Sequence, residues 1–340
     1  NLISVLTSFS LATVATNLRV KGGGDYYLIS RTLGVEFGGA LGLVLFIAQS
    51  VSVAFYAIGF GEAVVAITGA GSPALVAGAA VIVLFVLAYV GADAATRFQY
   101  VVMVVLGAAL IGFFVGGLNG FDAGLARANA GPATELPFWT LFAIFFPAVT
   151  GFTQGVSMSG DLRDPSRSLP VGTFLAVGVS MVVYFAAALV LSGSLPGTEL
   201  VRDYNTMRQI SIFPWLVDAG VIAATLSSAL ASFLGAPRIL QSLARDRVFP
   251  VLNPFATGHG PNENPRRGVL LALAIALATV AAGNLNVVAS LVSMFFLISY
   301  GLLNFATYYE SRAQSPSFRP TFRWHSPTVS LVGALACGGA

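Results

Sequence analysis

Residues 138–159 read FWTLFAIFFPAVTGFTQGVSMS, an apolar stretch interrupted near its middle by Pro147 and Gly151. A membrane crossing takes about 20 mainly apolar residues, because the hydrocarbon layer is about 30 Å thick and a helix rises about 1.5 Å per residue. Proline removes a backbone donor, and glycine adds backbone freedom. The stretch therefore predicts a membrane helix with an unwound turn, for which the plainer alternative is a simple proline kink.

The rest of the chain repeats this apolar pattern. Hydrophobic residues make up 56% of the 340 residues and charged residues 9%, whereas an ordinary soluble domain has about 25% charged residues. The runs lack a two-residue alternation, which favours helices over barrel strands, because each helix satisfies its own backbone in lipid. We expect an all-α polytopic membrane protein with ten apolar runs, at residues 2–16, 38–67, 74–90, 99–117, 138–158, 171–192, 213–236, 268–283, 286–308 and 327–340.

The basic residues divide unequally between the two sets of loops. Fourteen of the 17 follow odd-numbered runs, and the other three are Arg127, Arg202 and Arg208. Cytoplasmic loops carry the excess of positive charge, so the richer side is predicted to be cytoplasmic. Residues 237–247 on that side are expected to form a short interfacial helix, with a plain loop as the alternative. The first run then enters from outside at Asn1, so we expect an odd number of crossings to precede it. The last run is also expected to be truncated.

Several classes of function find no support in the sequence. A lone cysteine excludes an internal disulfide, and two histidines without a cluster of Cys, Asp or Glu give no transition-metal site. The G-x-x-x-x-G-K-[ST] motif of an ATP-driven motor does not occur, and the net charge of +3 needs no nucleic acid to explain it. Charged residues are absent from the middle of every run, which favours neutral or paired ionic cargo over a proton relay.

The predicted break offers groups of both polarities. Its outer half would end near Pro147 and Thr150, with carbonyl oxygens directed at the membrane centre, and these suit a cation. Its inner half would begin at Gly151, Phe152 and Thr153, whose unpaired N–H groups suit a small anion. Discontinuous helices of this kind form midplane binding sites in transporters built from inverted repeats.

The seventh run holds a second candidate site. Residues three and four apart share a helix face, so the carbonyl of Ala224 and the hydroxyls of Ser227 and Ser228 could surround a small hard cation. The alternative is that these serines bond back to the preceding turn or allow close helix packing. Tyr56 and Tyr300, deep in two other runs, are either satisfied buried phenols or ligand hydroxyls.

Four long motifs resemble the cation-chloride cotransporter family. In chain order they are KGGGDYYLISRTLGVEFGGALG (21–42), FFPAVTGFTQGVSMSGDLRDPSRSLPVGT (145–173), ATLSSALASFLGAPRILQSLARDRVFP (224–250) and FFLISYGLLNFATYYESRAQSPSFRPTFRWHSP (295–327). The resemblance runs nearly end to end. It implies the amino acid-polyamine-organocation fold, in which two inverted five-helix repeats are followed by two more helices.

On this resemblance the chain is a single transmembrane transporter domain, residues 1–340, covering roughly helices 2 to 11 of the family. Residues 1–117 would be the remainder of the first inverted repeat, 138–308 the second repeat, and 327–340 the start of an additional helix. The family's first helix, which is its other broken helix, would precede Asn1. Half of each central ion site is therefore expected to lie outside the sequence.

The resemblance also implies ligands, residue by residue. They are Tyr56, Pro147 and Thr150 for potassium; Gly151, Phe152, Thr153 and Tyr300 for chloride; and Ala224, Ser227 and Ser228 for sodium. The paired serines are similar to the sodium-dependent branch of the family. Phe152 and Thr153 depart from the small aliphatic residues usual at these positions.

The implied function is secondary active transport, in which sodium and/or potassium move with chloride by alternating access. No enzyme activity and no cofactor are expected. The alternatives are a sodium-coupled amino acid permease of the same fold and a non-transporting regulatory homologue. The implied partners are the inorganic ions, membrane lipid and a second copy in a homodimer, without nucleic acid, and the implied location is the plasma membrane.

Overall fold

The computed structural model describes residues 1–17, 24–90, 93–131, 136–157, 162, 164–203, 205–260, 263–313, 318–324 and 326–340. These residues form helices, and their only β-structure is an isolated bridge between His259 and Asn264. The expected all-α fold is thus confirmed. The long helices are α1 (Leu2–Asn17), α3 (Val35–Thr68), α4 (Pro73–Val90), α5 (Asp93–Asn119), α9 (Pro165–Ser194), α12 (Pro214–Arg245), α13 (Arg266–Ala282), α14 (Leu285–Ala313) and α15 (Pro327–Gly338).

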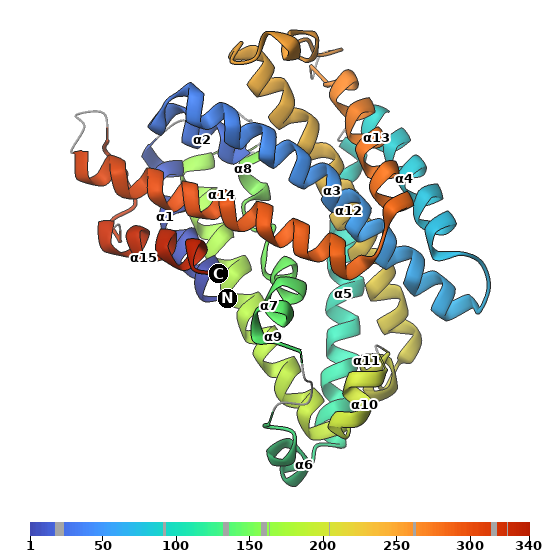
Figure 1. The fold of residues 1–340 in the computed structure, drawn as a ribbon. Helices are drawn as coiled ribbons and strands as arrows, with labels where there is room; N and C mark the ends of the chain where they lie inside the picture. The colour runs from blue at the N-terminus through green and yellow to red at the C-terminus, as the bar shows by residue number, and fades with distance from the viewer. Residues whose placement is uncertain are drawn as a thin grey trace.

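The shorter elements connect or interrupt these helices (Figure 1). They are α2 (Gly24–Leu33), α6 (Ala123–Ala128), α7 (Phe138–Phe145), the 3-10 segment η1 (Phe146–Val149), α8 (Gln154–Ser157), α10 (Gly197–Arg202), α11 (Thr206–Ile210) and the 3-10 segment η3 (Pro250–Phe255). Helices α6, α10 and α11 carry Arg127, Arg202 and Arg208, and Figure 1 places them at the opposite end of the molecule from α2. Arg19, Lys21 and Arg163, which belong to the basic loops, lie outside the described residues.

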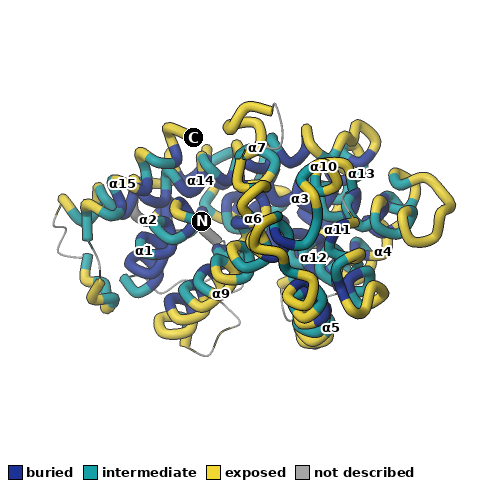
Figure 2. Tube along the Cα trace, turned by 90° about the horizontal axis from the view of Figure 1, so that it is seen from below, coloured by how far each residue is buried: buried dark blue, intermediate teal, exposed yellow. Residues whose placement is uncertain are grey.

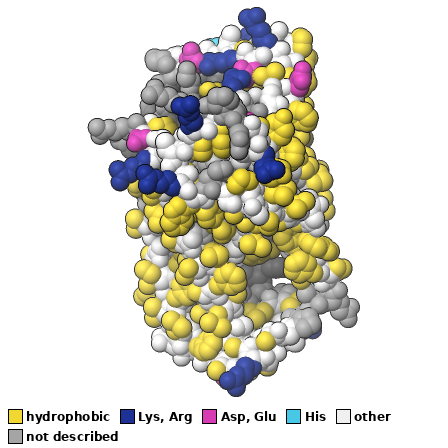
Figure 3. Space-filling model, turned by 90° about the vertical axis from the view of Figure 1, so that its left-hand side faces the viewer, with side chains coloured by type: hydrophobic (Ala, Val, Ile, Leu, Met, Phe, Trp, Pro, Cys, Tyr) yellow, Lys and Arg dark blue, Asp and Glu magenta, His cyan; other side chains and the backbone are white. Residues whose placement is uncertain are grey.

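The surface of the helix bundle fits a lipid environment. Within the described residues, six segments are long and apolar enough to cross a membrane, including Pro165–Ser194 and Gln99–Asn119. Helix α9 exposes large apolar side chains along its length, among them Val179, Val182 and Phe185. In Figure 3 hydrophobic side chains cover a broad band, and most visible Lys and Arg side chains gather toward one end. The chain is therefore an integral multi-pass membrane protein.

The long helices pack mainly around α3 and α1, which share α14 as a neighbour. Helix α3 packs against α4, α12, α13 and α14, α12 also packs against α5, and α1 packs against α9, α14 and α15. Helix α3 is the most buried of the membrane-capable segments (Figure 2). Its buried face includes small residues such as Ala48, Ser52 and Ala57. Small side chains allow helix backbones to approach closely in a membrane, which explains the central position of α3.

Helix α2 was not predicted, because its ten residues form no run of crossing length. Its Tyr26 is fully buried and donates a hydrogen bond to the Asp246 carboxylate, and Arg31 forms an ion pair with the same carboxylate at 2.9 Å. Burial raises the pKa of Tyr26, and Asp246 raises it further. The phenol therefore stays protonated, and its O–H donates the hydrogen bond to Asp246. Helix α2 is thereby fixed to the end of α12.

The prediction of a separate interfacial helix at residues 237–247 is wrong. Helix α12 instead continues through Pro237 as one helix to Arg245. Ile239, Leu240 and Leu243 on this extension are buried, so it packs against the protein rather than lying along a membrane surface. Gly268 of α13 approaches Pro237 closely, which keeps this part of α12 against its neighbour.

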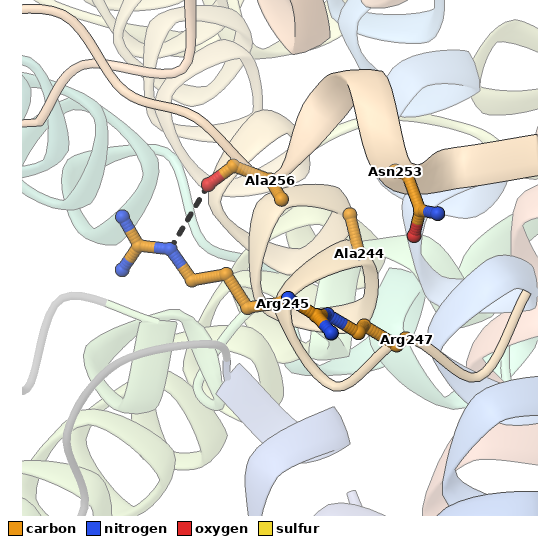
Figure 4. A pocket seen from close by; sticks show the side chains of 5 residues that line it. All are labelled: Ala244, Arg245, Arg247, Asn253 and Ala256. Atoms are coloured by element: carbon orange, nitrogen blue, oxygen red, sulfur yellow. Dashed lines mark hydrogen bonds between the residues drawn. The ribbon is translucent and has the colours of Figure 1, made fainter. Parts of the chain in front are cut away.

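The end of α12 borders a cavity of about 380 Å³ lined by Ala244, Arg245, Arg247, Asn253 and Ala256 (Figure 4). The Arg245 Nε donates to the carbonyl of Ala256 at 3.1 Å, as the dashed line in Figure 4 marks. Arg245 also pairs with the carboxylate of Glu263. These bonds tie the helix end to the chain that follows it, so Arg245 has a structural role here.

Packing of α2 on α3 depends on Gly38, and this can be tested. A Cβ at Gly38 would lie 2.5 Å from the Cα of Ser30, whereas a Cβ at Gly59 in the same helix would have its nearest neighbour at 3.8 Å. We expect Gly38→Ala to destabilise the protein by about 1–3 kcal/mol, because the backbones must move apart. Gly59→Ala should be neutral or slightly stabilising, since alanine favours helices. Thermal unfolding of both purified variants in detergent would check this, and equal midpoints would contradict it.

Candidate functional site

The predicted break is present in the structure. Helix α7 ends at Phe145, η1 continues to Val149, and Thr150 is extended with φ −97° and ψ −174°. Gly151 has φ +85°, in the left-handed region that favours glycine, and nothing lies within 4 Å of where its Cβ would be. Glycine is therefore required for its backbone conformation rather than for space. This is an unwound turn between two helical pieces, and the alternative of a simple proline kink is excluded.

The outer half of the broken helix, α7 with η1, is held by hydroxyl groups from other helices. Ser4 of α1 donates to the carbonyl of Val149 at 2.8 Å, and Tyr184 of α9 donates to the carbonyl of Ala148 at 2.6 Å. Ser293 of α14 donates to a third carbonyl, in α7, at 2.5 Å. Carbonyls at the end of a helix lack partners within it. Three neighbouring helices thus supply the missing donors.

The three potassium candidates lie close to the break. Tyr56 of α3 and Pro147 of η1 line the same cavity of about 670 Å³. The Thr150 hydroxyl donates to the Pro147 carbonyl at 2.7 Å, and the Thr150 N–H donates to the same oxygen at 3.2 Å. Hydroxyl and carbonyl oxygens are the ligands that hard cations prefer. The wall of this cavity is otherwise mainly apolar, so few oxygens would have to hold a cation there.

The structure brings three of the four chloride candidates together directly. The N–H of Gly151 donates to the Tyr300 hydroxyl oxygen at 3.3 Å, and the ring centroids of Tyr300 and Phe152 are 5.1 Å apart. Tyr300 and Thr153 are buried, whereas Gly151 is exposed. A phenol O–H and a backbone N–H on the same side of a turn are both donors to an anion. Hydrogen bonds to a charged acceptor are stronger than those between neutral groups.

The sodium candidates occupy α12. Ser227 is buried and donates to the side-chain oxygen of Gln99 on α5, so it does not follow the alternative of bonding back to its own helix. Thr225 does follow that alternative, since it donates to the Val221 carbonyl at 2.8 Å. Helix α12 is continuous at Ala224, so its carbonyl lies within the helix ladder.

Sequence reasoning missed the amide side chains in the apolar runs, because it searched them only for charges. Gln49, Gln99 and Gln154 each bond to another helix. Asn304 of α14 is fully buried, donates to the Thr7 hydroxyl of α1 at 2.8 Å and accepts a hydrogen bond from another α1 hydroxyl. A neutral amide inside an apolar run is a usable signal, because burying it without a partner is unfavourable.

Comparison with known proteins gives consistent results. The family model described as amino acid permease matches residues 1–340. Solute carrier family 12 member 2 from mouse is 35% identical over 98% of this chain and 33% of its own length, and the human protein is 35% identical over 98% and 32%. Solute carrier family 12 member 1 from mouse is 35% identical over 99% and 36%.

The chain thus spans about a third of the length of these relatives. The family match extends over the whole chain and includes every helix that contributes to the candidate site. It also includes all four motifs on which the family resemblance was based. The chain therefore belongs to the amino acid permease family, and its resemblance to the cation-chloride cotransporters is confirmed.

Proposed function

We propose that this chain forms part of the ion pathway of a secondary active transporter that moves sodium and/or potassium together with chloride by alternating access. The observation that carries the proposal is the unwound turn between η1 and α8. At this turn the Thr150 hydroxyl bonds to the Pro147 carbonyl, and the next residue, Gly151, donates its N–H to the Tyr300 hydroxyl. One turn thus offers acceptors to a cation and donors to an anion.

Paired ions solve an energetic problem that this chain cannot solve with its own charges. Charged residues are absent from the middle of every apolar run, so a lone bound ion would have no opposite charge nearby. Two opposite charges about 4 Å apart attract by roughly 4 kcal/mol at an effective dielectric constant of 20. Simultaneous binding of cation and anion therefore lowers the cost of moving either through a low-dielectric layer. This supports coupled, electroneutral movement.

We assign potassium to Tyr56, Pro147 and Thr150, and chloride to Gly151, Phe152, Thr153 and Tyr300. Support comes from the shared cavity of Tyr56 and Pro147 and from the hydrogen bond between Gly151 and Tyr300. We assign sodium to Ala224, Ser227 and Ser228, supported by their common helix face and by the motif resemblance. The Ser227 hydroxyl donates its proton to Gln99, which leaves its oxygen lone pairs available to a cation.

A sodium-coupled amino acid carrier is the second candidate, because the matching family model is described as amino acid permease. The donors at Gly151 and Tyr300 would suit a substrate carboxylate as well as chloride. The two functions differ in what must be present for cation movement: chloride in one case, an amino acid in the other.

The full-length protein in proteoliposomes should take up rubidium, which substitutes for potassium, only when chloride and sodium are present outside. The physical reason is charge compensation in the loaded site. Isotope uptake with chloride replaced by gluconate, and with sodium replaced by N-methylglucamine, measures each requirement. Uptake that needs neither ion would remove the proposal, and saturable sodium-dependent amino acid uptake would favour the second candidate.

Replacing Ser227 and Ser228 together by alanine should raise the apparent constant for sodium about tenfold or more, because two oxygen ligands are lost. The apparent constant for chloride should change little. Thr225→Ala is a matched control, since that hydroxyl bonds to its own helix. Sodium titrations of rubidium uptake would measure the effect, and an unchanged sodium constant in the double variant would exclude this assignment.

Tyr300→Phe removes the hydroxyl beside Gly151 and keeps the buried ring. We expect the apparent constant for chloride to rise about tenfold or more, because a hydrogen bond to a charged group is worth about 1.5–3 kcal/mol. Tyr309→Phe, at an exposed tyrosine of the same helix, is the control. Chloride titration of rubidium uptake gives the comparison, and equal constants in the two variants would mean that Tyr300 does not contact chloride.

A further inference from the structure

The inner half of the broken helix, α8, begins with an amide side chain that is bonded on two sides. The Gln154 Nε2 donates to the carbonyl of Ala231 on α12 at 2.9 Å. The Gln154 Oε1 accepts a hydrogen bond from Gln49 Nε2 on α3 at 3.0 Å. Gln49 is only 5% exposed. One neutral side chain therefore links α8 to the two central helices of the protein.

Helix α12 has a space for this side chain. A Cβ at Gly235 would collide with the Gln154 amide and would lie 3.3 Å from its Cδ. In an ideal helix the N–H of Gly235 donates to the carbonyl of Ala231, and this is the same carbonyl that accepts from Gln154. The Gln154 side chain therefore packs against this turn of α12. Glycine is unfavourable in a helix interior and usually has a packing reason there. Close approach of Gln154 supplies that reason.

The two halves of the broken helix are held by different partners. The outer half accepts hydrogen bonds from hydroxyls on α1, α9 and α14, and the first of these helices packs against the other two. The side chain of Gln154 in the inner half bonds instead to α3 and α12. Residues 150–153 therefore connect two pieces whose side-chain hydrogen bonds come from different helices.

We propose that Gln154 is a positioning residue for the anion-binding turn. Its side chain holds the start of α8 against α3 and α12, and its N–H donates to the Gly151 carbonyl at 3.0 Å, which closes the turn. The direction of the Gly151, Phe152 and Thr153 N–H groups then follows from where Gln154 is fixed. A neutral amide is suited to this role, because a cation at this position would bind the anion and a carboxylate would repel it.

The identity of the anion rests on the proposed function, whereas the anchoring of α8 does not. Gln154→Leu in the full-length protein keeps the side-chain size and removes both bonds. We expect a chloride constant at least fivefold higher with maximal rubidium uptake within twofold of wild type. We also expect at least fivefold faster amide hydrogen exchange in residues 151–157, because the turn loses its anchor. Gln49→Leu should produce a smaller change of the same kind.

Ser4→Ala is the matched control, since it removes a side-chain hydrogen bond of similar length from the outer half. It should leave both the chloride constant and the exchange of residues 151–157 within twofold of wild type. The double variant of Gln49 and Gln154 should resemble Gln154→Leu alone, because the bond between Gln49 and Gln154 is already lost in that single variant.

Unchanged exchange in residues 151–157 of Gln154→Leu would overturn the proposal, as would equal effects of Gln154→Leu and Ser4→Ala. Lower maximal uptake with an unchanged chloride constant would also overturn it, because that pattern indicates a general structural role. If wild-type uptake shows no chloride dependence, the proposed function fails instead. Hydrogen exchange, which needs no transport, then decides whether Gln154 anchors α8.

Discussion

An unwound turn inside a membrane segment leaves backbone groups without helix partners. In this structure side chains of the surrounding helices supply those partners, and this requirement constrains where the helices lie. Each unsatisfied group in hydrocarbon costs several kcal/mol. Here hydroxyls of Ser4, Tyr184 and Ser293 bond to carbonyls of the outer half, and the Tyr300 hydroxyl accepts from Gly151. The neighbouring helices must therefore lie at defined positions around the break. Such a turn is stable only within a bundle that surrounds it.

This arrangement relies on neutral groups, and this bears on the proposed binding of ions. Hydroxyls, amides and carbonyls can satisfy one another without an ion and can also reorient toward one. The hydroxyl of Thr150 on the Pro147 carbonyl and the hydroxyl of Ser227 on Gln99 are bonds of this kind. A site built from such pairs exchanges protein hydrogen bonds for ion contacts, so the net cost of emptying it is small. Reversible binding needs this balance.

The sequence predicted the local features well and the long-range ones poorly. The break at Pro147 and Gly151 was predictable, because proline and glycine act on the backbone at their own positions. Helix α2 and the continuation of α12 past Pro237 were not. They depend on the contact of Tyr26 with Asp246, 220 residues away, and on packing against Gly268. The pairing of Tyr56 with Pro147 in one cavity also required the folded chain.

The hydrogen bonds of Gln154 bear on how the two halves of the broken helix can move. An inward movement of α8 away from α3 and α12 must break its bonds to Gln49 and Ala231, whereas the hydroxyl bonds of the outer half can stay intact. Movement of the outer half against α1 and α9 has the opposite effect. Alternating access requires two such movements that do not occur together. A broken helix whose halves bond to different helices can break one set of bonds and keep the other, whereas a continuous helix would move as one piece.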